Sequence, residues 1–258
     1  MIIDPLYALS GFAVGALVGI TGVGGGSLMT PLLILFFGVH PATAVGTDLL
    51  FASATKTVGT AVHGLGRTID WRVVGRLATG SIPMTVLTLG LLYYLGVDTA
   101  MVNTLITSVL ACALFATSII LIFRKKILTL YGHRIAALPL RRTVFYTVAM
   151  GAFLGVLVSL SSVGAGAIGV TALILLYPHL PMARIVGSDI AHAVPLTFVA
   201  GFGHWMLGMT DLELVGSLLA GSVPGIILGS YAAPRIPDVA LRYVLAGTLM
   251  VVGGRLLF

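Results

Sequence analysis

A glycine-rich run interrupts the first apolar stretch of the sequence and has the composition of an anion-binding loop. The run spans residues 22–26, between the hydroxyl groups of Thr21 and Ser27. A helix that begins at such a run points free N–H groups and a partial positive charge at a ligand beside it. Glycine also lets the ligand approach the backbone closely. The predicted small-anion site here is formed by Thr21, Gly22, Gly24, Gly25, Gly26 and Ser27.

A second run of this kind, at residues 161–166, occupies the corresponding place in the other half of the chain. It has Ala165 where the first run has Gly25, so an equal contribution of the two runs stays open. The alternative is that the small residues only allow helices to pack closely, which is the interpretation we favour for Gly11 and Gly15. The predicted contributors from this run are Ser161, Ser162, Gly164, Ala165 and Gly166.

Three charged residues lie within apolar segments and are candidates for moving charge. Asp48 and Asp189 follow a Gly-Thr pair and a Gly-Ser pair, near the expected starts of two helices. Each is either an N-terminal helix cap or a carrier of a proton or cation. Lys56 lies about two turns beyond Asp48, where a lysine either faces a transport path and adds charge to the anion site or extends to the membrane surface.

Three histidines complete the set of coupling candidates. His63 and His204 occupy matching positions at the expected ends of two helices, and His192 lies deeper in the second of them. Histidine titrates near neutral pH and can relay protons. The alternative for His63 and His204 is a polar helix end at the membrane surface. No spacing of His, Cys or acidic residues predicts a metal site, and we expect no cofactor.

The composition predicts a protein that spans a membrane many times. Hydrophobic residues make up 58% of the 258 residues and charged residues only 9%, against about 25% charged residues in soluble domains. Apolar runs reach about 20 residues, the length that crosses a hydrocarbon core. The net charge of +6 resides mostly in short loops, where membrane orientation explains it and a nucleic-acid partner is not needed.

The two halves of the chain align with each other, which predicts an ancient duplication. Gly11 aligns with Gly151, Asp48 with Asp189, and His63 with His204. Repeat 1 covers 6–123, with apolar segments 6–37, 44–64, 73–95 and 100–123. A polar linker covers 124–142. Repeat 2 covers 143–258, with apolar segments 144–177, 185–207, 213–233 and 239–257.

The first apolar segment of each repeat is too long for one span and is broken midway, so we predict a re-entrant hairpin of two half-helices. If neither hairpin crosses the membrane, every Lys and Arg except Lys56 and Arg255 falls on the side of the linker, as the positive-inside rule requires. The predicted fold is therefore all-α and polytopic, with two inverted repeats that each contain a hairpin and three transmembrane helices. The alternative is eight plain transmembrane helices.

The run at residues 21–27, followed by Pro31 and then by Gly46-Thr47-Asp48, resembles the TauE/SafE family of sulfite exporters and related anion permeases. The resemblance covers nearly the whole chain, including the two repeats. It implies transport of sulfite, sulfonates or related sulfur-containing anions. The second half departs from the pattern, because Ala165 and Thr171 replace Gly25 and Pro31.

The sequence thus favours a secondary transporter that moves a small sulfur-containing anion, of a sulfite, sulfonate or sulfoacetate-like kind, across the cytoplasmic (inner) membrane. Protons or the membrane potential are the expected driving force, and the expected partners are the anion and the lipid bilayer. A passive anion channel is the alternative. An intramembrane enzyme is disfavoured, because the only glutamate, Glu213, lies in an expected loop and neither glycine-rich run contains arginine.

Cysteine accessibility tests the predicted orientation. Single cysteines introduced near either terminus, in a background without Cys112, should react with an impermeant thiol reagent added outside cells, because both termini are expected on the non-cytoplasmic side. A cysteine placed within residues 124–142 should react only after the membrane is permeabilised. Labelling of the linker and protection of the termini in intact cells would contradict this topology.

Overall fold

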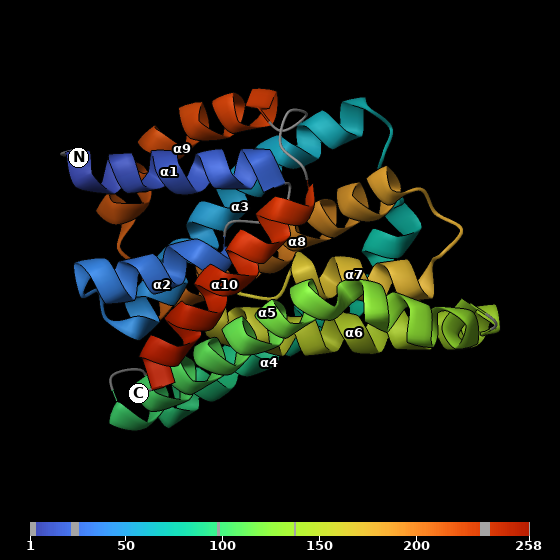
Figure 1. Ribbon diagram of the computed structural model, residues 1–258. Helices are drawn as coiled ribbons and strands as arrows, with labels where there is room; N and C mark the ends of the chain where they lie inside the picture. The colour runs from blue at the N-terminus through green and yellow to red at the C-terminus, as the bar shows by residue number, and fades with distance from the viewer. Residues whose placement is uncertain (1–3, 22–25, 97–98, 137, 233–237, 258) are drawn as a thin grey trace.

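The computed structural model describes residues 4–21, 26–96, 99–136, 138–232 and 238–257, and these ranges contain ten α-helices and no strand. The fold is all-α, as the sequence predicts (Figure 1). The helices of the first half are α1 (Pro5–Thr21), α2 (Gly26–Phe37), α3 (Pro41–Leu65), α4 (Trp71–Leu95) and α5 (Ala100–Ala136). Those of the second half are α6 (Leu140–Ser161), α7 (Ala167–Leu176), α8 (Met182–Met206), α9 (Leu212–Ala232) and α10 (Asp238–Leu257).

The first apolar segment of each half is divided into two helices, as expected from the broken runs. Within the described residues, α4, α5, α6, α8 and α9 are long and apolar enough to cross a membrane. The second hairpin has unequal limbs: α6 has 22 residues and is span-length, whereas α7 has 10 residues, about 15 Å, and is too short to cross. The limbs are therefore not two equal half-helices.

The predicted linker at 124–142 is mostly helical. Helix α5 continues to Ala136 and contains 37 residues, about 55 Å of helix, which is far more than the apolar core of a bilayer requires. Helix α6 already begins at Leu140. The polar residues after Arg124 therefore extend α5 beyond its apolar part, and the connection itself is only a few residues long.

The two halves are joined by equivalent pairs of helices, so that the main contacts made by helices of the first half on the second half are repeated with the halves interchanged. Helix α1 packs on α9 and helix α6 packs on α4, while α3 packs on α8 and α5 on α10. Gly11 contacts the backbone of Leu218, and the aligned Gly151 contacts that of Leu77. A Cβ atom at either glycine would overlap the neighbouring carbonyl group. Gly11 and Gly151 therefore serve close helix packing, as expected for Gly11.

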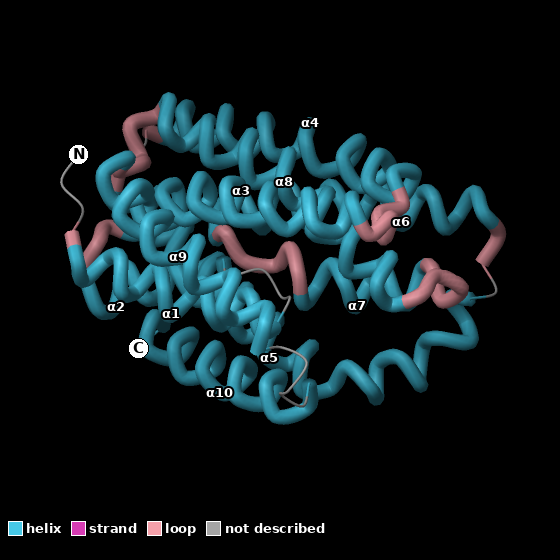
Figure 2. Tube along the Cα trace, turned by 90° about the horizontal axis from the view of Figure 1, so that it is seen from above, coloured by secondary structure: helices cyan, strands magenta, loops and turns pink. Residues whose placement is uncertain are grey.

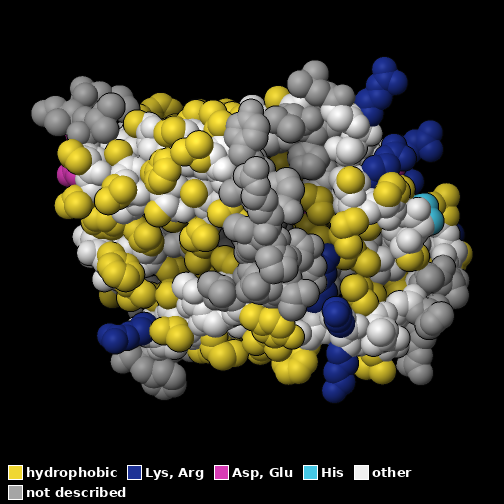
Figure 3. Space-filling model, turned by 45° about the horizontal axis from the view of Figure 1, so that its top comes forward, with side chains coloured by type: hydrophobic (Ala, Val, Ile, Leu, Met, Phe, Trp, Pro, Cys, Tyr) yellow, Lys and Arg dark blue, Asp and Glu magenta, His cyan; other side chains and the backbone are white. Residues whose placement is uncertain are grey.

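The two hairpins begin at opposite ends of the molecule. Both termini lie at one end, and the α5–α6 connection lies at the other (Figures 1 and 2). Helix α1 starts at the first end and α6 at the second. On the face seen in Figure 3, hydrophobic side chains are spread over the described surface, and most Lys and Arg side chains lie toward the α5–α6 end. This arrangement is the one that inverted repeats require, and the inversion relative to a bilayer stays a prediction.

Two glycine substitutions test the close helix contacts. Gly151→Ala should lower the stability of the protein by about 1–3 kcal/mol, because the added methyl group forces α6 away from α4. Gly75→Ala, on α4, is the matched control, since its Cβ would meet nothing within 4 Å. The control should be neutral or stabilising by up to about 1 kcal/mol. Thermal unfolding in detergent measures both, and equal melting temperatures would refute a packing role for Gly151.

Candidate functional site

Four ionisable side chains lie together in the buried centre of the helix bundle and are called the central cluster. They are Asp48 and Lys56 on α3 and Asp189 and His192 on α8. Asp48 and His192 are fully buried, and Lys56 is 7% exposed. Burying a charge among apolar helices is costly unless another charge or a hydrogen bond compensates it. The cluster therefore marks either a structural ion network or a transport site.

Asp48 is held where three segments of the chain meet. The Thr30 hydroxyl group, on α2, donates a hydrogen bond to its Oδ2 atom. The hydroxyl group of Ser162, from the connection between α6 and α7, lies beside the same carboxylate. Neither Asp48 Oδ1 nor Ser162 Oγ has a hydrogen-bond partner. The first half thus supplies an acid to the break in the second half, where the Ser162 hydroxyl group is its neighbour.

Asp189 occupies the corresponding place on α8 but has different neighbours. Its Oδ1 atom lies against Gly169 of α7, where a Cβ atom would overlap it. Lys56 interacts electrostatically with both carboxylates. A cation from the first half is therefore compensated by acids from both halves. Because Lys56 is buried, it does not extend to the membrane surface.

His192 and His204 are both buried but have different environments. His192 Nε2 lies 2.9 Å from Ser81 Oγ on α4, while Nδ1 has no partner. The ring also interacts electrostatically with Lys56, so it belongs to the central cluster. His204 Nε2 lies 2.8 Å from the carbonyl oxygen of Ser159 and must donate to it. His204 thus anchors the last turn of α8 to α6, and its burial rules out a polar helix end at the membrane surface.

The α6–α7 break covers residues 162–166 and is buried throughout. Ser162 has a φ of +58°, and Gly164 and Gly166 have φ of +117° and +136°, values that favour glycine. The Ser161 hydroxyl group donates to the carbonyl oxygen of Leu157 and accepts from the N–H of Val163, so it stabilises the turn. Helix α7 starts after Gly166 without a side-chain cap. Its N-terminus faces the interior as an anion-binding helix end would.

The Gly-Thr-Asp motif and its Gly-Ser-Asp counterpart join the two halves and position the acids. Gly46 contacts the backbone of Met209, and Gly187 contacts that of Thr68. The next residue in each motif accepts a backbone N–H from the opposite half: Asp211 donates to Thr47 Oγ1 at 3.1 Å. The third residue, the aspartate, then points into the core.

In repeat 2, the equivalent bond runs from the N–H of Asp70 to Ser188 Oγ at 2.8 Å. The carboxylate groups of Asp70 and Asp211 each accept N–H bonds from the first turn of the helix that follows them. Asp48 and Asp189 lie about two turns inside α3 and α8, so their interpretation as helix caps is wrong. Asp70 and Asp211 are the aspartates that cap helices, and they cap α4 and α9.

Part of the predicted site lies outside the described structure. The structure does not describe Gly22, Gly24 and Gly25. It describes only the helical backbone of Thr21, Gly26, Ser27 and His63. The structure brings Asp48, Lys56, Asp189, His192 and Ser162 together. His204 lies apart from this cluster, on the α6 backbone.

Three residues of the site were missed from the sequence: Thr30, Ser81 and Gly169. Ser81 could have been found, because Gly80-Ser81-Ile82-Pro83 aligns with Gly221-Ser222-Val223-Pro224. Thr30 and Gly169 align with residues of another type in the other half. The match between the halves, which marks Asp48 and Asp189, is therefore missing for these two residues. Their roles depend on which helix faces each aspartate.

With this geometry in place, comparison with known proteins identifies the family. The model of the family described as "Sulfite exporter TauE/SafE" matches residues 7–256. This chain belongs to the TauE/SafE family. The break, the exchanged helix pairs and the central cluster are therefore features of a TauE/SafE membrane transporter. No solved structure matches the chain significantly.

Curated relatives support the same conclusion. The chain is similar to the "Probable membrane transporter protein YjnA" of Bacillus subtilis, with 38% identity over 96% of this chain and 98% of the relative. YdhB of the same organism, also named a probable membrane transporter protein, is 27% identical over 98% of this chain and all of the relative. The similar MJ0441 of Methanocaldococcus jannaschii is 25% identical over 82% of this chain and 75% of the relative.

A double-mutant cycle tests the compensation of Lys56 by Asp189. Lys56→Met should lower stability by about 3–5 kcal/mol, because it leaves buried carboxylates without their cation. Adding Asp189→Asn or Asp48→Asn should restore part of that loss, since Lys56 interacts electrostatically with both carboxylates. Thermal unfolding of the purified variants measures all three. No restoration by either asparagine variant would disprove the compensation.

Proposed function

We propose that this TauE/SafE transporter is a secondary transporter of a small sulfur-containing anion, of a sulfite, sulfonate or sulfoacetate-like kind, in the cytoplasmic (inner) membrane. The observation that carries the proposal is the buried lysine of the central cluster, which interacts electrostatically with an acid of each half. A chain that needed only to fold could have an apolar side chain at this position, as the cost of burying Lys56 indicates.

Three features of the centre favour an anion as the transported species. When protonated, Lys56 places a full positive charge in a region of low dielectric, where charge acts strongly. Helix α7 adds the partial positive charge of its N-terminus. The Ser162 hydroxyl group has no partner and can donate to an anion. The glycine-rich run at 22–26 is the proposed counterpart from the first half, which would give two helix ends facing one substrate.

Coupling to protons or to the membrane potential is proposed from the balance of charge in the cluster. Two carboxylates and one ammonium group leave an excess negative charge when all three are ionised. Asp48 and Asp189 are both candidate proton carriers, because each has an Oδ1 atom without a hydrogen-bond partner. Either acid can hold Lys56 when substrate is absent, and His192 is a further candidate for the proton. His63 and His204 stay candidates for a relay outside the cluster.

The proposed path follows from the two hairpins. If the long axis in Figure 1 crosses the bilayer, the α1–α2 and α6–α7 hairpins enter from opposite sides and end near the middle. The repeats would then be inverted, and the substrate would bind at the midplane between them, as in other inverted-repeat transporters. The basic α5–α6 end would face the cytoplasm.

Anion binding by a charge-balanced variant tests this function. Ligands are first ranked by thermal shift with sulfite, sulfate, sulfoacetate, taurine and carboxylate controls, since binding to the folded state raises apparent stability. Calorimetry with the best ligand should then show an affinity at least about tenfold lower for Lys56→Met/Asp189→Asn, or about 1.4 kcal/mol. Asp189→Asn alone keeps the lysine and should bind with nearly normal affinity.

The double variant matters because Lys56→Met alone also disturbs folding. An unchanged dissociation constant in the double variant would remove Lys56 from the anion site. A carrier should in addition show saturable flux in liposomes, whereas flux that rises linearly with anion concentration would favour the passive channel.

A further inference from the structure

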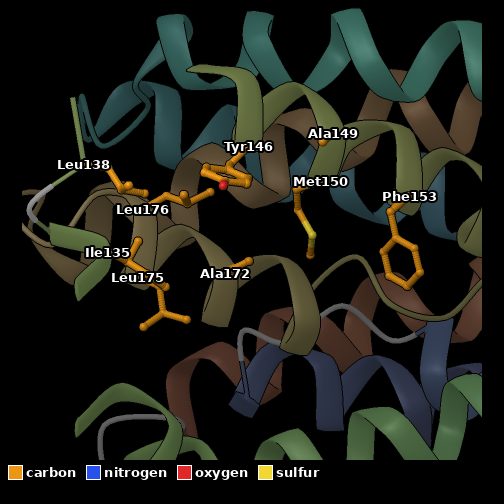
Figure 4. Close-up of a pocket in the computed structure, with 9 residues that line it drawn as sticks. All are labelled: Ile135, Leu138, Tyr146, Ala149, Met150, Phe153, Ala172, Leu175 and Leu176. Carbon is orange, nitrogen blue, oxygen red and sulfur yellow. The ribbon is translucent and has the colours of Figure 1, made fainter. Parts of the chain in front are cut away.

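An apolar groove on the outside of the second hairpin continues into a basic pocket at the α5–α6 end. The apolar groove has a volume of about 620 Å³, within the range of small-molecule sites. Its walls are one face of α6, with Tyr146, Met150 and Phe153, and one face of α7, with Ala172 and Leu176. Figure 4 shows Met150 and Phe153 directed from α6 into the space opposite Ala172.

The basic pocket has a volume of about 380 Å³ and lies at the N-terminus of α4 and the C-terminus of α7. Its polar lining includes Arg72, Arg76, Asp70 and His179. The Asp70 carboxylate accepts N–H bonds from the first turn of α4 as its helix cap. Two guanidinium groups outnumber this one carboxylate, so the pocket is net positive.

One of these guanidinium groups is held in place. Arg76 Nη1 donates to the Tyr177 hydroxyl group at 3.2 Å, and that hydroxyl group lies 2.8 Å from Thr147 Oγ1 on α6. Tyr177 is 4% exposed, so a buried anchor fixes Arg76 at the mouth of the apolar groove. Arginine is well suited to bind phosphate through paired N–H groups.

The two spaces are adjacent, because Ile135, Leu138 and Leu176 line both of them. Tyr146 is 47% exposed and Phe153 is 52% exposed, as expected for side chains that face hydrocarbon in a membrane transporter. A ligand that fits both spaces must be apolar at one end and anionic at the other. An inorganic anion would use only the basic pocket.

We propose that this groove is a binding site for an anionic phospholipid, with its phosphate at Arg72 and Arg76 and an acyl chain between α6 and α7. Basic pockets between transmembrane helices at the cytoplasmic side are suited to anionic headgroups. The structure describes ten basic side chains outside the central cluster. Nine of them belong to the part of the fold toward the α5–α6 end: Arg67, Arg72, Arg76, Arg124, Lys125, Lys126, Arg141, Arg142 and Arg184. The tenth, Arg255, is in the last turn of α10. The lipid would brace the two limbs of the broken hairpin from outside.

Native mass spectrometry of the full chain tests the site, with phosphatidylglycerol and phosphatidylcholine as probes. The wild-type protein should retain phosphatidylglycerol preferentially. Arg72→Gln/Arg76→Gln should lower its retention by about tenfold or more, given roughly 1 kcal/mol for each basic residue near anionic lipid. Lys125→Gln/Lys126→Gln is the matched control, since it removes the same charge at exposed positions that line neither space.

A second variant acts from the apolar side and keeps the test decisive if the arginine variant folds poorly. Ala172→Phe should fill the groove and lower phosphatidylglycerol retention, whereas Val86→Phe, at an exposed position of α4, should not. Equal retention by the groove variants and their controls would overturn the proposal. So would displacement of the lipid by millimolar inorganic phosphate, which would assign the basic pocket to free anions, or protection of the groove by a second copy of the chain.

Discussion

The fold depends on keeping charge in the middle of an apolar helical bundle. Lys56 is tolerated there because Asp189 approaches from the opposite half and Asp48 lies on the same helix. Each acid in turn contacts the hairpin of its own half, Asp48 through Thr30 and Asp189 through Gly169. Removing one charge therefore affects α2, α3, α7 and α8 together. The relative position of the two halves is therefore held by the charges of the central cluster as well as by helix packing.

The close approach of the helices depends on residues without side chains. Gly11 and Gly15 let α1 rest on the α9 backbone, and Gly151 and Gly155 do the same for α6 on α4. In a bilayer, such contacts replace the hydrophobic driving force that soluble helices have. Each hairpin is thereby attached to the half from which it does not originate. The break of the second hairpin consequently lies at the centre, where Ser162 is beside Asp48.

The halves share a framework but differ in chemistry at equivalent positions. Lys56 is replaced by Thr197, and His192 is replaced by Phe51. The cation therefore comes from α3 and the imidazole from α8, so that the cluster is complete only when both halves contribute. Thr30 likewise bonds to Asp48, whereas Asp189 is packed against a glycine. A duplicated fold has in this way acquired one asymmetric centre, and the surrounding packing has kept its symmetry.

Much of this could be predicted from the sequence. Apolar segment length predicted the helices, and the internal alignment predicted two repeats, because a repeat preserves the glycines and polar residues that packing requires. The same alignment marked Asp48 and Asp189, the second broken run marked Ser162, and depth in an apolar segment marked Lys56. The helical continuation of α5 was missed, because polar helix and polar loop have similar composition.

Only the tertiary structure decided what those residues do. It assigned helix capping to Asp70 and Asp211 and left Asp48 and Asp189 for the core, since a cap is defined by where a helix begins and not by residue type. It brought Ser81, Thr30 and Gly169 to the central cluster from three other helices. Contacts between residues far apart in the chain depend on which helix faces carry the close packing. The composition of a single segment does not contain that information.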